Sequence, residues 1–259
     1  MVRLFLKTYC TAAMAAVFLC LPAAQAADVS FLPPVDLSAS VLPPVIDAQA
    51  GFESLSALPG EARTMAGGRI IALDVDLANS PGFSAEVVDG HLQLRYRMAF
   101  NNIAEGWSWQ PLADPQSEDY YRAKFLPLKS VLAERGEYDQ ADKIGETQRM
   151  KVTWRYDYFA AFDNLYDFYP RTVDDDSGFS VVLPAPAAGQ DLPPVRMLAM
   201  LRLLDPVVAE STTFWKATHA QPTDFTLKKR YLVGQLVEVW FCDSASGQVL
   251  ARLKARAAP

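Results

Sequence analysis

The stretch Gln148–Tyr169, QRMKVTWRYDYFAAFDNLYDFY, decides the fold that we predict for this chain. One side of its first half carries Met150, Val152, Trp154, Tyr156 and Tyr158, and polar residues alternate with them. This period of two, in residue types that favour strands, predicts a half-buried β-strand. Aromatic side chains bury a large area each, so one such strand can anchor a core. A second interpretation is that these side chains form a platform for a ligand.

The first residues have the order of a secretory signal peptide. Arg3 and Lys7 provide a positive start, and Thr11–Leu21 is mainly apolar. Ala24-Gln25-Ala26 has the small-x-small pattern that a signal peptidase reads. The apolar run is too short to span a bilayer as a helix. We therefore expect residues 1–26 to direct export by a Sec-type route and to be removed, which leaves a soluble periplasmic or secreted protein.

The composition narrows the classes of partner and of chemistry. The formal net charge is −6, and the loss of Arg3 and Lys7 makes the mature chain more acidic. Nucleic acid and anionic lipid both require a basic surface, so we expect neither as a partner. After cleavage only Cys242 of the three cysteines remains, which predicts no internal disulfide. With so few cysteines and only two histidines, we expect no nitrogen- or sulfur-ligated metal and no cofactor.

Paired prolines mark the segment before the predicted domain. Residues 27–68 contain the near-repeat FLPPVDLSAS and VLPPVIDAQA, at Phe31–Ser40 and Val41–Ala50. Such prolines favour extended polyproline-II geometry, so we expect an irregular linker along the domain surface. A rigid docking motif is the alternative. Residues 69–259 are then expected to form a single α+β domain.

Strand patterns recur through the predicted domain. Asp89-Gly90, between two of them, is a strong hairpin signal, because a two-residue turn needs positive φ at both positions. A second hairpin is expected near the C-terminus, with Gly247 at the left-handed turn position. The predicted strands are Arg69–Asp76, Ala85–Val88, His91–Phe100, Gln148–Tyr158, Phe179–Leu183, Val195–Leu204, Tyr231–Cys242 and Gln248–Leu253.

Helices are predicted in two regions between these strands. After Ser117, a good N-cap, apolar side chains recur at helical spacing, at Tyr121, Phe125, Leu128 and Leu132. A second short helix is expected at Tyr138–Glu146. Asp205 before Pro206 is typical of a helix start, which predicts a helix over Pro206–Lys216. Together the elements predict an α+β fold, in which two or three helices cover one face of a mainly antiparallel sheet.

The polar loop Asn101–Gln116 holds the candidate binding residues. Trp107 and Trp109 lie there, next to Glu105, and exposed tryptophans stack on sugar rings or on partner side chains. In the alternative interpretation both rings fold back over the core. Because alternate residues of an extended loop point to opposite sides, at most one indole should pack inward. We expect the ligand-binding site at Glu105, Trp107, Trp109, Tyr120 and Tyr121.

Known catalytic motifs do not occur in the sequence, which has no G-x-S-x-G, H-E-x-x-H, phosphate-binding Gly-rich loop or paired C-x-x-C. Asp174–Gly178 has the D-x-D-x-G spacing of a calcium loop, but Ala185 stands where the bidentate Glu should be, so no metal site is predicted. We expect a non-catalytic binding or interaction protein of the cell envelope, with a protein or glycan partner. The alternative is a carbohydrate-active hydrolase with two carboxylates in a cleft, since such enzymes need no local motif.

Overall fold

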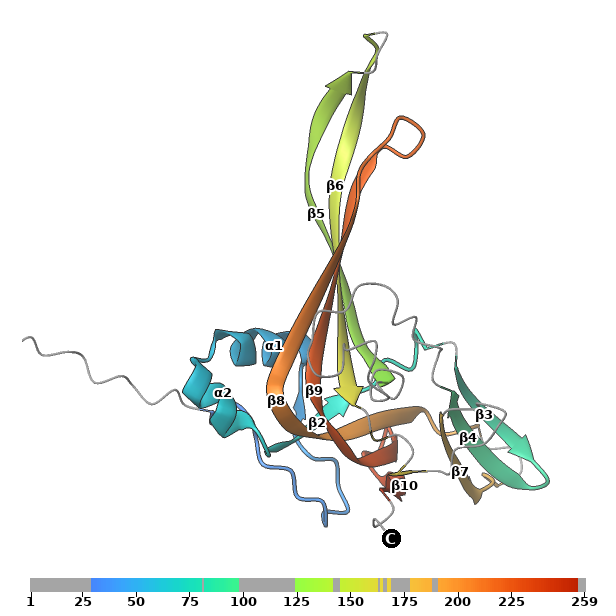
Figure 1. Ribbon diagram of the computed structural model, residues 1–259. Helices are drawn as coiled ribbons and strands as arrows, with labels where there is room; N and C mark the ends of the chain where they lie inside the picture. The colour runs from blue at the N-terminus through green and yellow to red at the C-terminus, as the bar shows by residue number, and fades with distance from the viewer. Residues whose placement is uncertain are drawn as a thin grey trace, which may run out of the picture.

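The chain is built mainly of β-strands. The computed structural model describes residues 29–80, 82–97, 124–141, 145–162, 164, 167–168, 178–187 and 191–255. Strands make up 61% of these residues, and helices make up 10%. The predicted α+β fold is therefore wrong: a curled mixed sheet dominates, and the described residues form two short helices instead of a helical layer on one face (Figure 1).

The larger sheet has seven strands, in the order β1-β2-β8-β9-β6-β5, with β10 paired to β9. Two of its pairs are parallel, β1 with β2 and β6 with β9, so antiparallel pairing is only part of the arrangement. The strands are β1 Val45–Ile46, β2 Ile70–Asp74, β5 Lys124–Ala141, β6 Thr147–Phe162, β8 Val195–Trp215, β9 Thr223–Asp243 and β10 Val249–Lys254.

A smaller antiparallel sheet lies beside the larger one, with the order β3-β4-β7. Its strands are β3 Phe83–Val88, β4 His91–Arg97 and β7 Gly178–Pro184. Val88 pairs with His91 across Asp89-Gly90, whose φ angles of 51° and 73° are those that a two-residue turn requires. The predicted hairpin is confirmed. The second hairpin, β9–β10, is confirmed as well, with Gly247 at φ 72°.

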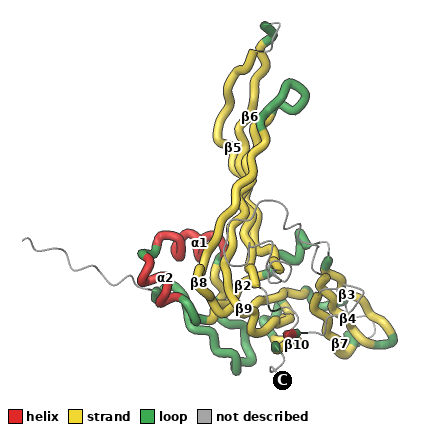
Figure 2. The backbone as a smooth tube through the Cα atoms, viewed as in Figure 1, coloured by secondary structure: helices red, strands yellow, loops and turns green. Residues whose placement is uncertain are grey.

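Four long strands leave the rest of the molecule together and form a projecting arm (Figures 1 and 2). We define the arm as residues 129–141 of β5, 147–158 of β6, 208–215 of β8 and 223–230 of β9, and we name the remainder the body. The parallel register of β6 with β9 joins two antiparallel hairpins, β5–β6 and β8–β9, into one four-stranded ribbon.

In the body, β8 and β9 are buried on both faces. Side chains with no exposed surface alternate between two apolar clusters, with Met197, Ala199, Leu201, Val239 and Phe241 in one and Leu198, Met200, Trp240 and Cys242 in the other. The sequence of a strand that is covered on both faces is a nearly continuous apolar run, and both of these segments have such a sequence. This double burial is the main apolar core of the molecule.

Two helices lie in the proline-containing segment that we expected to be irregular, α1 at Ala48–Ala57 and α2 at Gly60–Ala66. Asp47 caps α1 by accepting a hydrogen bond from the Ala50 amide at 2.9 Å. Phe52 of α1 is buried and meets the Tyr158 ring edge-on at 6.1 Å, where the arm joins the body. Neither helix has the length and apolar character of a membrane-spanning segment.

The two helices predicted before the strand Gln148–Tyr158 are wrong, because β5 occupies the part of that region that the structure describes. The register of β5 with β6 shifts between Pro127 and Lys129 and again between Glu134 and Gly136. Each shift adds one residue to β5, so the side of the strand that a given residue occupies changes there. The apolar spacing that predicts a helix does not mark one buried face, because Phe125 and Leu128 are buried whereas Leu132 is 66% exposed.

The helix predicted after Asp205 is also wrong, because residues 206–215 continue β8. Pro206 lies where the register of β8 with β9 shifts between Leu203 and Val208. A strand tolerates proline at such an irregularity because no ladder hydrogen bond is required from its nitrogen. The Asp-Pro pair, taken as a helix start, instead marks the point at which β8 leaves the body and enters the arm.

Candidate functional site

The residues predicted to bind a ligand, Glu105, Trp107, Trp109, Tyr120 and Tyr121, lie outside the described residues. The acidic turn at residues 174–177 lies outside them too. These sites stay predictions. The part of the chain that the structure does describe offers two other candidate regions, the arm and a notch beside β9.

One face of the arm carries cationic and aromatic side chains in rows, which we name the ladder face. It comprises Arg135, Trp154, Tyr156, Tyr158, Lys228 and Arg230. In the parallel register Tyr156 pairs with Lys228, and Tyr158 pairs with Arg230, so each ring has a cation beside it on the same face. The Trp154 ring centroid lies 4.8 Å from Arg135 Cζ and 5.4 Å from Lys228 Nζ. Such contacts contribute about 0.5–1 kcal/mol each at exposed sites.

Glu210 of β8 neutralises the part of the ladder face nearest the body. Its carboxylate accepts hydrogen bonds from Arg230 Nε at 2.8 Å and from Lys228 Nζ at 3.1 Å. Arg230 also donates to the Tyr158 hydroxyl at 2.9 Å and lies over the Phe52 ring. Partial burial alone would raise the pKa of Glu210, but the two cationic donors outweigh it and hold that pKa below its ordinary value. These contacts connect the arm to α1.

Asp224 binds the two hairpins together at the far end of the arm. Its carboxylate accepts from the Ala217 amide at 2.6 Å, from Lys216 Nζ at 2.9 Å and from the Tyr138 hydroxyl at 3.0 Å. Tyr138 belongs to β5, whereas the other two donors follow β8. Burial would raise the pKa of Asp224, but the three donors together lower it below 3.8.

Two large aromatic side chains are exposed beside this cluster. Phe214 and Trp215, the last residues of β8, keep 56% and 49% of their surface exposed. Successive residues of a strand point to opposite faces, so both faces of the arm present an aromatic ring at this end. Trp215 contacts the Phe225 ring at 5.5 Å. The sequence prediction missed this pair because both residues were assigned to the helix predicted over Pro206–Lys216.

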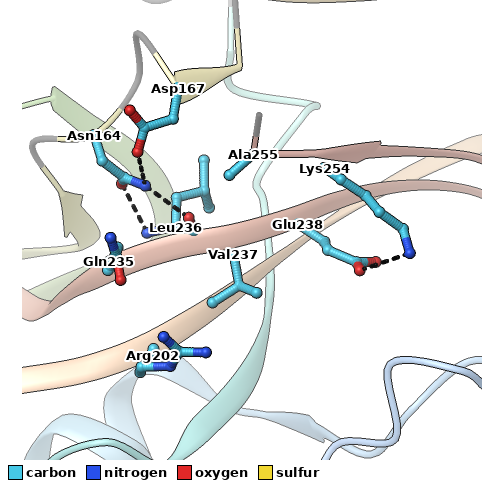
Figure 3. A pocket seen from close by; sticks show the side chains of 9 residues that line it. All are labelled: Asn164, Asp167, Arg202, Gln235, Leu236, Val237, Glu238, Lys254 and Ala255. Atoms are coloured by element: carbon cyan, nitrogen blue, oxygen red, sulfur yellow. Dashed lines mark hydrogen bonds and ion pairs between the residues drawn. The ribbon is translucent and has the colours of Figure 1, made fainter. Parts of the chain in front are cut away.

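A cavity of about 400 Å³, which we name the notch, lies beside β9 (Figure 3). Along that edge of β9, pairing with β6 ends at Val233 and pairing with β10 begins at Glu238. The Asn164 side chain bridges the gap, because it accepts from the Leu236 amide and donates to the Leu236 carbonyl, both at 2.9 Å. The lining residues are Asn164, Asp167, Arg202, Gln235, Leu236, Val237, Glu238, Lys254 and Ala255.

Two carboxylates line the notch, and both accept from protein donors. Glu238 is only 4% exposed, and its carboxylate accepts from the Trp240 indole at 2.7 Å and pairs with Lys254 at 3.4 Å. Asp167 accepts from the Asn164 amide group at 3.1 Å. No cluster of three metal-ligating side chains occurs in the described part of the chain. The notch can therefore take a small polar molecule, with the carboxylates already engaged in the fold.

Cys242 is a free cysteine buried in the body. Its side chain has no exposed surface, and burial raises the pKa of its thiol to about 11. The thiol is therefore protonated at neutral pH, whereas a nucleophile or metal ligand must be a thiolate.

Comparison with known proteins assigns no activity to these regions. No protein-family model, no curated protein and no solved structure matches the chain. The functional inference therefore depends on the arm and the notch.

Proposed function

We propose that the chain is an exported, non-catalytic protein that binds a protein partner through the far end of its arm. The observation that carries this proposal is the exposure of Phe214 and Trp215 at the end of strands that project from the body. Leaving large apolar side chains in water costs free energy, and aromatic residues are enriched at the centres of protein interfaces. A partner that covers both rings would recover that free energy.

The charged groups of the arm support a binding role over a catalytic one. Glu210 and Asp224 are each held by two or three donors, and the pKa of each is lowered. A general acid in a glycosidase requires a raised pKa. Throughout the described residues, the carboxyl groups with a shifted pKa are all shifted downward, namely Asp36, Asp47, Glu210, Asp224 and Asp243.

Site-specific photo-cross-linking in exporting cells tests the arm as the binding element. A photoreactive residue in place of Phe214 should give a discrete cross-linked product with a protein. The same probe at Val182 in the small sheet, which is 61% exposed, should give none. Adding Trp215→Ala should reduce the Phe214 product about ten-fold, because one interface aromatic is worth 1–2 kcal/mol or more. Equal products from both probes, or none from Phe214, would contradict the proposal.

Export is tested separately, because it depends on the signal peptide alone. The full chain should be recovered from the periplasm or the medium with its N-terminus near Ala27, and deletion of residues 2–26 should retain it in the cytoplasm. An intact N-terminus on the recovered full-length protein would contradict the predicted cleavage. A failure of export would not contradict the binding role of the arm, which the cross-linking tests separately.

A second candidate function is the carbohydrate-active hydrolase, because Asp167 and Glu238 line one cavity. Two carboxylates in one cleft are the arrangement that such chemistry uses. The protein and its Glu238→Gln variant would be incubated with cell-wall polymers, and released reducing ends would be measured. We expect no turnover from either, since both oxygens of Glu238 accept from protein donors. Turnover by the unaltered protein that the variant lacks would establish the hydrolase instead.

A further inference from the structure

The notch lies where a β-bulge interrupts the pairing of β8 with β9. Met200 and Leu201 are neighbours in β8, but they pair with Glu238 and Leu236, so Val237 is an extra residue of β9. A bulge changes the side of the strand that a side chain occupies, and bulges are frequent beside functional sites. The notch opens beside the same residues, because neither β6 nor β10 pairs with residues 234–237 (Figure 3).

The bulge brings four polar side chains to one face of the sheet. Residues three apart in a regular strand point to opposite faces, but the extra residue places Gln235 and Glu238 on the same face. Arg202 is the cross-strand neighbour of Gln235, and Lys254 is the cross-strand neighbour of Glu238. Neighbours across a sheet project to the same side, so these four side chains leave the sheet together at the notch.

Glu238 and Lys254 neutralise each other, whereas Arg202 has no counter-charge. The Glu238 carboxylate is 4% exposed, pairs with Lys254 at 3.4 Å and accepts from the Trp240 indole at 2.7 Å. Among the described residues, neither the Arg202 guanidinium nor the Gln235 amide group makes a hydrogen bond or an ion pair. The notch therefore has a cation and an amide with donor hydrogens that are available to a ligand.

Asp167 places the opposite charge at the rim of the notch. The Asp167 amide donates to the Asn164 carbonyl, and the Asn164 side chain donates to one Asp167 oxygen, both at 3.1 Å. Asn164 is itself bound to the backbone of Leu236, so the carboxylate is held beside β9. In the part of the chain that the structure describes, the other oxygen has no donor, and no ion pair joins Asp167 to Arg202.

We propose that the notch binds a small zwitterion, a free α-amino acid or a short peptide, whose carboxylate meets Arg202 and whose ammonium meets Asp167. Two opposite charges that line one cavity without pairing are complementary to a molecule that carries both. A guanidinium binds a carboxylate through two parallel hydrogen bonds, and the Gln235 amide can donate to the same group. The volume of about 400 Å³ is typical of small-molecule sites.

The site lies in the body, so it is independent of the protein partner proposed for the arm. Arg202 and Asp167 are both exposed, and water therefore weakens each contact. We expect a dissociation constant on the order of 1 mM, a range in which ligands exchange rapidly.

Blocked peptides test the two charges on the unaltered protein. Alanine, dialanine and trialanine would be titrated into ¹⁵N-labelled protein produced from the full chain, and the amide signals of Val237 and Glu238 would be followed by NMR. At least one of these zwitterions should shift both signals, and their relative affinities distinguish a free amino acid from a peptide. N-acetylated dialanine lacks the ammonium, and dialanine amide lacks the carboxylate, so each should bind at least about ten-fold more weakly than dialanine.

Variants then assign each charge to its residue. Arg202→Gln should weaken dialanine about ten-fold and leave dialanine amide unchanged, because that ligand has no carboxylate for the guanidinium. Asp167→Asn should weaken dialanine similarly and leave N-acetylated dialanine unchanged. Arg95→Gln in the small sheet, which removes an exposed arginine that donates to Gln93, should have no effect.

Three results would overturn the zwitterion site: no shift with any of the three ligands, equal binding of the blocked and free peptides, or equal effects of Arg202→Gln and Arg95→Gln. Both altered side chains of the notch are exposed, so the variants should keep the fold. If one of them fails to fold, the comparison of blocked and free peptides decides alone, since it requires no substitution.

Discussion

The same strands, β8 and β9, pass through the body and the arm, and the two regions stabilise them differently. In the body, Leu198 and Leu201 have no exposed surface although they lie on opposite faces of β8. In the arm, Thr212 and Phe214 of the same strand are exposed. The pairing of β8 with β9 therefore resumes beyond its irregularity at residues 204–207 and continues past the end of the apolar core. What changes between the regions is the source of stability: apolar burial in the body, and cross-strand side-chain pairs in the arm.

This difference has a consequence for how the molecule opens. Elements with many buried apolar contacts exchange their amides only on global unfolding, and elements with few such contacts open locally. The body should therefore unfold as one unit. The arm should open from its far end at a lower free energy, with Arg230 and Asp224 as the groups that limit the opening.

The largest effect is expected from Trp240→Ala in the body. Trp240 is fully buried, its indole donates to Glu238, and Arg252 Cζ lies 3.9 Å from its ring centroid. Removing a buried aromatic side chain leaves a cavity and costs about 3–5 kcal/mol. Urea denaturation followed by tryptophan fluorescence would measure the free energy of unfolding. A loss below about 1 kcal/mol would mean that the body does not carry the stability.

A smaller loss is expected from Arg230→Met, which disconnects the ladder face from α1. The change removes charge-assisted hydrogen bonds to Glu210 and Tyr158, each worth about 1.5–3 kcal/mol in similar sites, and keeps the apolar stem. We expect a loss of about 2 kcal/mol in urea denaturation. Arg155→Met is the matched control, because Arg155 pairs with Asp157 on the opposite, exposed face and should cost at most about 1 kcal/mol. Equal losses would show that the ladder face has no special role.

Strands were predictable from the sequence wherever their pattern is regular, in the body and in the arm. All eight predicted strands overlap observed strands, and Gln148–Tyr158, with its clear alternation, lies in the arm. Two bulges interrupt the alternation of β5, so most of that strand was missed. Residues 206–215 of β8 and 223–230 of β9 were missed as well. The parallel pairing of β6 with β9 carries no local signal at all.

The site predicted at Trp107 and Trp109 stays a prediction, because these residues lie outside the described ones. The exposed pair at the end of the arm, Phe214 and Trp215, was not predicted from the sequence. Phe214 and Trp215 follow Ser211–Thr213, and threonine and aromatic residues favour strands. The helix start predicted from Asp205-Pro206 was given more weight than this pattern. The Asp224 cluster joins residues from β5, β8 and β9, so its composition depends on pairings that no single segment specifies.

Asp224→Asn should loosen the end of the arm and leave the body intact. The amide keeps the shape of the carboxylate but loses the charge that Lys216 and Tyr138 bind. Hydrogen exchange should accelerate about ten-fold in residues 213–225, while residues 197–201 keep their protection. Asp139→Asn, which removes only an exposed pair with Arg149, should change neither. Acceleration in both regions would show that arm and body open together.

The same cluster gives the arm a predictable response to acid. The pKa of Asp224 in the folded chain lies below its ordinary 3.8. The folded state therefore binds this proton less readily than the open state, so the stabilisation is complete above pH 3.8 and is lost as the pH falls through the lowered value. Amide protection in residues 213–225 should fall in that range, and Asp224→Asn should abolish this dependence. An unchanged profile in the variant would assign the acid response to another group.

The smallest effect on stability is expected from Trp215→Ala, and this variant separates the two regions most clearly. Trp215 is 49% exposed and its main ring contact is Phe225, so its loss should change the free energy of unfolding by at most about 0.5 kcal/mol. It should nevertheless reduce the cross-linked product of the Phe214 probe about ten-fold, since the proposed partner covers the ring. Urea denaturation and photo-cross-linking would measure the two quantities. Trp240→Ala should give the reverse outcome, a large loss of stability whose effect on cross-linking follows only from unfolding. If Trp215→Ala instead cost as much stability as Trp240→Ala, the end of the arm would belong to the core, and its aromatic side chains would serve the fold and not a partner.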